Sequence, residues 1–286
     1  AKGAAMARID ETLARGPNEL KLSPLASSLR GVTRGLVAWS PVIVLLIGWE
    51  AFARSGAVTP FMLPAFSAVL ERIATDAASG ELPVAIGLTL WRALAGFFIS
   101  AAAGIALGLA MARLRWCYWF FDPIISVGFP IPKIAFLPII VLWLGFFDVS
   151  KITMIVFNSI FPVVTATVVG VYGVEKELIW SARNLGTSER ALTWEVMLPA
   201  ALPQIFTGLQ VALPIALIVG ILTEMAMGGY GIGASMQTAS RFADSLGVFA
   251  GIIEIAVVGY ALVKLMAVLR ARLLVWHPEA LEPTTV

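Results

Sequence analysis

Six long apolar stretches, separated by shorter polar segments, set the pattern of this chain. They cover residues 35–53, 93–112, 119–147, 152–174, 196–223 and 246–268. A helix needs about 20 mostly apolar residues to cross the hydrocarbon core of a bilayer, and every stretch is close to that length or longer. The pattern predicts an all-α integral membrane protein with six transmembrane helices.

The third stretch is less regular than the other five. Asp122 and Lys133 interrupt it, and prolines stand at positions 123, 130, 132 and 138. Proline lacks the backbone N–H that a helix interior uses, and its ring clashes with the preceding turn. We therefore expect kinks or unwound turns in this span.

Composition supports the membrane interpretation and excludes several kinds of site. Hydrophobic residues make up 59% of the chain and charged residues 13%, whereas soluble domains carry about 25% charged residues. The single cysteine, Cys117, excludes a disulfide framework and any cysteine-built metal centre, and the single histidine, His277, excludes most histidine-based chemistry. We expect no metal site. The net charge of +2 gives no basis for nucleic-acid binding, which needs clustered phosphate contacts.

The distribution of basic residues predicts the orientation of the chain. If the N-terminus is cytoplasmic, 14 of the 20 Lys and Arg residues lie in cytoplasmic segments, the side on which positive residues accumulate. The other six are Arg54, Arg72, Arg92, Lys133, Lys151 and Arg241. We expect both termini in the cytoplasm, with an N-terminal segment 1–34, a membrane domain 35–270 and a C-terminal tail 271–286.

The outer segment between the first two spans, 54–90, is too long for a simple turn. It contains an amphipathic stretch, 67–77, with apolar residues at Val69, Leu70 and Ile73. This stretch predicts a short interfacial helix.

The inner segment 175–199 is the most polar part of the membrane domain and predicts two short helices. The first ends at Gly186, which suits a left-handed C-terminal cap. The second begins after Thr187 or Ser188 as N-cap and ends at Pro199. We expect this helix-turn-helix to serve a function at the cytoplasmic face. An ordinary solvated connection between two spans is the alternative.

A specific motif lies within this inner segment. The residues Ser181-Ala182-Arg183-Asn184-Leu185-Gly186 are followed, after nine residues, by Val196-Met197-Leu198-Pro199. This arrangement resembles the Glu-Ala-Ala loop of permease subunits in binding-protein-dependent ABC importers. Trp180 stands where that family has Glu, and Ser181 where it has the first Ala. Glu177, one helical turn earlier, is a candidate to replace the missing carboxylate.

The resemblance extends over about residues 61–276. The segments 61–69, 130–132 and 143–146 are similar to the nitrate, sulfonate and taurine branch of these permeases. The resemblance implies the ABC type I importer permease fold and the transport of a small organic or inorganic anion, such as a sulfonate, taurine or nitrate. Aromatic acids and vitamin precursors are alternative cargoes.

The resemblance also implies partners, in a bacterial cytoplasmic (inner) membrane. These are a second permease copy in a homodimer, two cytoplasmic ATP-binding subunits and an external substrate-binding protein. The chain has no Gly-x-x-x-x-Gly-Lys-Ser/Thr loop, so we expect it to be no enzyme and to hold no cofactor, with ATP and Mg²⁺ bound by the ATPase partner. The residues expected to dock on that partner are Ser181, Ala182, Arg183, Asn184, Leu185, Gly186, Thr187, Ser188, Glu189 and Arg190.

Four polar residues in the spans are candidates for the translocation path or its gate: Arg92, Lys133, Asn158 and Glu224. Polar and ionisable groups within a membrane are costly and commonly functional. Each has a simpler interpretation. Glu224 could lie in interfacial water, Arg92 and Lys133 could snorkel to the membrane surface, and Asn158 could hydrogen-bond between helices.

Glycines predict two further features. Gly96, Gly104 and Gly108 fall near one face of the second span and predict close helix packing, with a two-fold interface between copies as one place for it. The cluster 228–233 lacks the strand context and the lysine of a nucleotide-binding loop. We interpret it as a tight re-entrant turn near an outer gate.

Two other functional classes fit the sequence less well. A secondary transporter is expected to contain inverted repeats or central ion sites, and no internal repeat is evident. An intramembrane hydrolase needs a nucleophile beside a base, and no span contains a histidine that could serve Cys117.

Overall fold

The computed structural model describes residues 24–276, with side chains from residue 39 onward. The chain divides into two units, residues 1–58 and 59–286. In the first unit, α2 (Pro24–Arg54) covers the predicted span 35–53, and Arg54 pairs with Glu50 one turn earlier at 2.6 Å. Much of the predicted end segments, with His277, lies outside the described residues.

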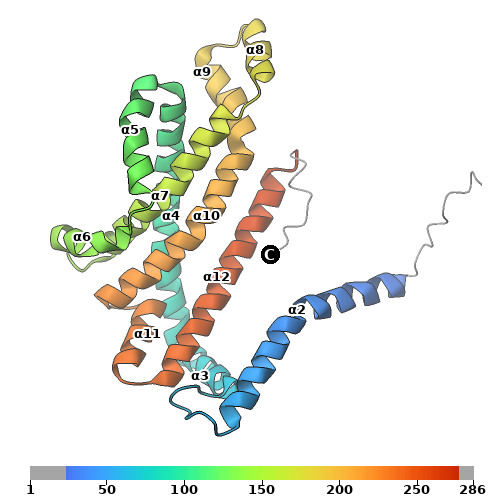
Figure 1. Cartoon of the computed structure of the whole chain (residues 1–286), viewed down its shortest axis with the longest axis vertical. Coiled ribbons are helices and arrows are strands. Elements are labelled where there is room, and N and C mark those ends of the chain that lie inside the picture. The colour runs from blue at the N-terminus through green and yellow to red at the C-terminus, as the bar shows by residue number, and fades with distance from the viewer. Residues whose placement is uncertain (1–23, 277–286) are drawn as a thin grey trace, which may run out of the picture. The chain divides into compact units, whose positions relative to one another are not determined.

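The second unit, as far as it is described, is built from helices (Figure 1). These are α3 (Phe66–Ser79), α4 (Glu81–Arg113), α5 (Arg115–Gly128), η1 (Lys133–Phe136), α6 (Leu137–Leu144), α7 (Asp148–Tyr172), α8 (Lys176–Asn184), α9 (Glu189–Ala191), η2 (Leu192–Met197), α10 (Leu198–Met227), α11 (Ile232–Arg241) and α12 (Ser245–Leu273). The long helices α4, α7 and α10 pack on one another and form its centre. Helix α12 packs on α10 and α11, and α3 lies against α12 and α4.

Four helices of the described part are long and apolar enough to cross a membrane, and they account for four of the predicted spans. They are α4, α7, α12 and the continuous segment Glu189–Met227 that contains α10. A fifth span is present if α5 and the segment Lys133–Leu144 count as one broken helix. The all-helical membrane fold is thus confirmed, while the count of six stays a prediction.

The third span is broken, as its prolines predicted. Helix α5 ends at Gly128, and the chain resumes at Lys133 with a change of direction of 98°. Pro130 and Pro132 lie in the break, where no helical N–H is required of them. Pro138 stands in the first turn of α6, a position that tolerates proline. Pro123, in contrast, lies inside α5 without ending it.

The glycine face of α4 packs against α7 of the same chain. A β-carbon at Gly104 would come within 2.8 Å of Val163, and one at Gly108 within 2.6 Å of Thr167. Gly96 faces Ile155 in the same way. The prediction of close packing is confirmed, but the suggested two-fold interface at these glycines is wrong. The small residues let two neighbouring helices of one chain approach, and α7 already covers that face.

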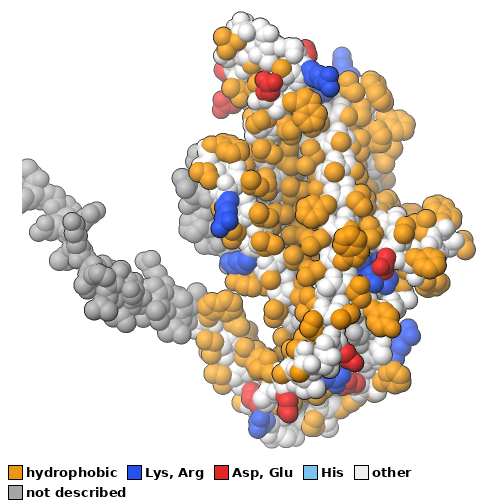
Figure 2. Space-filling view, turned by 180° about the vertical axis from the view of Figure 1, so that it is seen from behind, with side chains coloured by type: hydrophobic (Ala, Val, Ile, Leu, Met, Phe, Trp, Pro, Cys, Tyr) orange, Lys and Arg blue, Asp and Glu red, His pale blue; other side chains and the backbone are white. Residues whose placement is uncertain are grey.

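The outer surface of the second unit is strongly apolar. Leu142, Trp143 and Trp119 are each exposed over about three quarters of their surface, and Figure 2 shows hydrophobic side chains over most of the visible helical face. Soluble monomers rarely expose so much apolar surface to water. It is the surface expected of helices in contact with lipid.

Candidate functional site

The loop between α7 and α10 folds as two short helices, as predicted. Helix α8 ends at Asn184, and Gly186, two residues later, is left-handed with φ of 83°. The Gly186 N–H donates to the Arg183 carbonyl at 2.9 Å, and the Thr187 N–H donates to the Ala182 carbonyl at 3.1 Å. This paired arrangement is the Schellman motif, and glycine is favoured in it because a β-carbon is strained at positive φ. Ser188 then caps α9 by accepting from the Ala191 N–H.

The predicted end of the second helix at Pro199 is wrong. Helix α9 runs into η2, a π-helical turn, and η2 runs directly into α10. Pro199 is tolerated because it stands in the first turn of α10, directly after the wider π turn. The loop is therefore joined to the span α10 without a break, so that a displacement of the loop acts directly on that helix.

An ion-pair cluster ties the loop to α4. The Glu189 carboxylate accepts from Arg113 at the end of α4 at 2.6 Å and from Arg183 on α8 at 2.9 Å. Arg113 also contacts the Met197 sulfur at 3.4 Å. Sequence reasoning placed Glu189 and Arg183 in the loop but did not identify Arg113. The available signal was a basic residue in the last turn of a span. Sequence reasoning used this residue only as evidence for which side of the membrane is cytoplasmic.

The loop also presents uncovered apolar side chains. Leu185 is 84% exposed and Trp180 56% exposed, and α8 contains no buried residue. A leucine and a tryptophan this exposed in a charged loop are typical of a surface that binds another protein. The ten predicted docking residues lie together on this loop.

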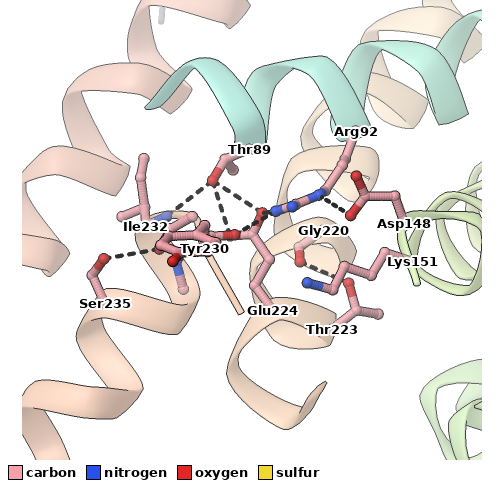
Figure 3. A network of polar contacts seen from close by, with 12 residues as sticks. Thr89, Arg92, Asp148, Lys151, Gly220, Thr223, Glu224, Tyr230, Ile232 and Ser235 are labelled. Carbon is pink, nitrogen blue, oxygen red and sulfur yellow. Dashed lines mark hydrogen bonds and ion pairs between the residues drawn. The ribbon is translucent and has the colours of Figure 1, made fainter. Parts of the chain in front are cut away.

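At the other end of the unit, Glu224 is fully buried in a polar network (Figure 3). The Thr89 hydroxyl lies 2.9 Å from its Oε2, Arg92 donates to its Oε1 at 2.6 Å, and the Gly233 N–H donates to Oε2 at 3.1 Å. The interpretation of Glu224 as a side chain in interfacial water is wrong. Its carboxylate is stabilised by three donors from outside α10.

Arg92 extends the network to α7 and to the glycine turn. It pairs with Asp148 through Nε at 2.9 Å and donates through Nη1 to the Tyr230 carbonyl at 2.6 Å. Lys151 donates to the Gly228 carbonyl at 2.9 Å. Thr89, Asp148 and Lys151 were missed by sequence reasoning, because their positions near span ends looked like ordinary boundaries. Arg92 is 95% shielded and does not snorkel.

The cluster 228–233 is a tight turn, as predicted. Gly228, Gly229 and Gly231 all have positive φ, at 72°, 96° and 134°. A β-carbon at Gly231 would overlap the Glu224 carboxylate. Glycine is therefore required here both by backbone conformation and by the close approach of Glu224. The turn joins α10 to α11, which packs back against α10.

The other two predicted path residues lie outside this network. Lys133 donates to the Phe129 carbonyl at 2.9 Å, with its ammonium 4.2 Å from the centre of the Phe161 ring. Asn158 donates to the Met154 carbonyl of its own helix at 2.8 Å. The structure therefore unites Arg92 and Glu224 but leaves Lys133 and Asn158 in separate surroundings. Within residues 24–276, no group of three or more metal-binding side chains is close enough to hold an ion.

A cavity of about 810 Å³ lies beside the glycine turn, between α3, α4 and α11. Arg72 and Asp244, which line it, form an ion pair at 2.9 Å, and Arg72 also pairs with Asp76. The Gly247 N–H, together with the Arg72 guanidinium, lowers the pKa of Asp244 below its ordinary value. This cluster joins α3 to the start of α12.

Comparison with known proteins places the chain among transport components. Residues 102–275, more than half of the chain, match the family described as binding-protein-dependent transport system inner membrane component. The chain is 34% identical over 244 residues to the taurine transport system permease protein TauC of Escherichia coli (strain K12), which covers 82% of this chain and 88% of that protein. It is 31% identical over 247 residues to the putative aliphatic sulfonates transport permease protein SsuC of Bacillus subtilis (strain 168), with coverage of 86% and 88%. The crystal structure of an amino acid ABC transporter with histidines shares the fold, at a TM-score of 0.55 and 16% identity over 70% of this chain and 97% of that one.

Proposed function

Since the chain belongs to the family of binding-protein-dependent transport system inner membrane components, we propose that it carries a small sulfonate, with taurine as the leading candidate. The chain is the membrane-spanning permease subunit of an ABC importer in the cytoplasmic membrane, and a separate subunit hydrolyses ATP. The observation that carries the substrate proposal is the similarity, over more than four fifths of the chain, to permeases named for taurine and for aliphatic sulfonates.

The loop 175–199 is the docking element for the ATPase subunit in this proposal. Support comes from its exposed Trp180 and Leu185, which offer apolar surface to a partner. Its charged residues Arg183 and Glu189 are engaged with each other and with Arg113. Since these two charges are held within the permease, the exposed apolar side chains are the part of this loop that can pack against the partner. Two copies of the ATPase subunit would serve two copies of the permease in a homodimer.

Motion of the docked loop would reach two spans by separate routes. One route is the unbroken backbone from α9 through η2 into α10. The other is the ion pair between Glu189 and Arg113 at the end of α4. Closure of the ATPase pair would then move α4 and α10 as rigid bodies. At their far ends the Arg92–Glu224 pair holds the same two helices together, so this network would serve as part of the gate.

Reconstitution of the complete transporter tests the proposal. The permease is assembled with its ATPase subunit in lipid. ATP hydrolysis is then measured with the external binding protein and, in turn, taurine, alkylsulfonates, nitrate, an aromatic acid and a vitamin precursor. We expect stimulation by the binding protein loaded with taurine or another sulfonate. Stimulation by an aromatic acid or a vitamin precursor instead would refute the substrate assignment. An absence of any associated ATPase would refute the docking of loop 175–199.

A further inference from the structure

A cavity of about 410 Å³ lies between α5 and α7, apart from the polar network and from the docking loop. Asp122 lines it, together with the aromatic residues Tyr118 and Tyr172 and the hydroxyl-bearing residues Ser126 and Thr165. The volume falls within the range of about 300–1,000 Å³ that is usual for small-molecule sites. A small solute fits such a space.

Asp122 differs from the other acidic residues of the neighbouring spans in having no cationic partner. Asp148 and Glu224 both pair with Arg92, whereas no lysine or arginine of residues 39–276 forms an ion pair with Asp122, and none lines the cavity. Tyr118 stands one helical turn before Asp122 on α5 and lines the same cavity. A carboxylate within a broken apolar span is costly unless a positive charge is supplied to it. Asp122 is half-buried and presents to this cavity a negative charge that no lysine or arginine of the lining neutralises.

The aromatic lining favours a particular kind of cation. Tyr118 and Tyr172 stand edge to face, with ring centres 6.1 Å apart and planes at 63°. Aromatic faces attract ammonium groups through their electron-rich surfaces. The hydroxyl oxygens of Ser126 and Thr165 can accept hydrogen bonds from those N–H groups of an ammonium that are not bonded to the Asp122 carboxylate. Together these groups suit a primary ammonium, which carries three donors and a compact charge.

We propose that this cavity binds the primary ammonium group of the transported solute, with Asp122 as its counter-ion. This inference rests on the proposed function and refines it. Taurine is a sulfonate that carries an amine, whereas a simple alkylsulfonate carries none. A lone sulfonate gains no positive partner from the cavity lining and is repelled by Asp122. The site thus selects aminosulfonates over alkylsulfonates of the same length. The headgroup of an ethanolamine lipid carries the same ammonium chemistry and is the other possible source of it.

Direct binding tests the proposal with the assembled permease–ATPase complex. The complex is placed in nanodiscs of phosphatidylcholine and phosphatidylglycerol, without ethanolamine lipid and without the binding protein. Calorimetric titrations with taurine, ethylamine and ethanesulfonate separate the two ends of the solute. We expect taurine and ethylamine to bind and ethanesulfonate to bind at least about tenfold more weakly.

Variants locate the binding. Asp122→Asn should weaken taurine binding by about tenfold or more, and Asp122→Glu should retain most of it. Glu254→Gln is the matched control, because it removes a carboxylate of a span outside this cavity, and it should leave taurine binding unchanged. ATPase activity and thermal unfolding show that each complex is assembled.

Three results would overturn the inference. The first is equal taurine binding by wild type and Asp122→Asn. The second is equal binding of taurine and ethanesulfonate by wild type, and this comparison overturns the proposal even if the variant folds poorly. The third combines two observations: taurine does not bind in nanodiscs without ethanolamine lipid, and Asp122→Asn alters the thermal stability of the complex only in nanodiscs that contain this lipid. That result would assign the cavity to lipid. In each case an active, associated ATPase would leave the importer function standing, whereas a permease with no ATPase attached would refute that function instead.

Discussion

Arg92 on α4 and Glu224 on α10 form an ion pair of 2.6 Å that is closed to solvent. The two residues are 132 positions apart in the chain. The Glu224 side chain has no exposed surface and that of Arg92 only 5%. Since neither charge can turn to water, the loss of either residue leaves the other charge buried without its partner.

Removal of one partner should be more damaging than removal of both. Arg92→Met leaves the Glu224 carboxylate buried without its cation, and we expect a loss of about 3–5 kcal/mol in the free energy of unfolding. The double variant Arg92→Met with Glu224→Gln should lose less stability than Arg92→Met alone, because it leaves no buried charge without a partner. Thermal unfolding of the purified permease measures this, with the exposed Arg241→Met as the control. Equal effects of Arg92→Met and Arg241→Met would contradict the prediction.

Gly231 should tolerate no side chain. Gly231→Ala forces a β-carbon onto the Glu224 carboxylate at a φ of 134°, and backbone strain of this kind costs about 1–3 kcal/mol. We expect a lower unfolding temperature. Gly87→Ala is the control, because a β-carbon at this position of α4 meets open space. The prediction fails if the two alanine variants unfold at the same temperature.

The tie between Glu189 and Arg113 should matter for coupling more than for assembly. Glu189→Gln weakens the contact of the loop with α4, so we expect ATP hydrolysis to persist while its stimulation by the loaded binding protein falls severalfold. Exchange of the charges, in Glu189→Arg with Arg113→Glu and Arg183→Glu, should restore part of the stimulation. Arg115→Gln, which removes a neighbouring exposed charge, serves as the control. Full stimulation in Glu189→Gln would exclude this route.

Leu185 should anchor the ATPase subunit. A charged side chain at this exposed position would have to be desolvated on docking, so Leu185→Asp should reduce the amount of ATPase recovered with the permease by about tenfold, equivalent to about 1.4 kcal/mol. Quantitative co-purification in detergent measures it. Lys176→Gln, at the start of α8, should have little effect. If Leu185→Asp retains the ATPase in full, another part of the chain forms the main contact.

The contact of Asp244 with Arg72 should make stability depend on pH in the acid range. The pKa of Asp244 is lowered in the folded state, so its contribution is fully present above the unfolded value of about 3.9. It is lost as the pH falls through the lower folded value. Because the pair is about one third exposed, we expect less than about 1 kcal/mol.

The measurement compares unfolding temperatures of wild type and Asp244→Asn between pH 7 and pH 3. The variant should be the less stable protein at neutral pH. The difference should shrink below about pH 4, where Asp244 becomes protonated in the unfolded chain while its lowered pKa still keeps it charged in the folded protein. A difference that stays constant over the whole range would show that the charge of Asp244 does not contribute.

Sequence reasoning succeeded where the cause is local. Gly186 follows a short amphipathic helix and adopts the left-handed cap that the pattern predicted. Pro130 and Pro132 mark the break in the third span. In both cases the conformation follows from the residue itself and its immediate neighbours. The same reasoning failed at Pro199, because the tolerance of that proline depends on the π turn that precedes it.

The sequence by itself determined the membrane class, the helical segments and the family motif, because apolar length, proline and glycine act within a few residues. Only the tertiary structure decided which charges meet. Glu224 looked like an interfacial residue until Thr89 and Arg92 were seen to enclose it, and the glycines of α4 looked like a surface for a second copy until α7 was seen to cover them. The energy of a buried charge or a close helix contact depends on partners far away in the chain, and a linear pattern of hydrophobic and polar residues does not specify them.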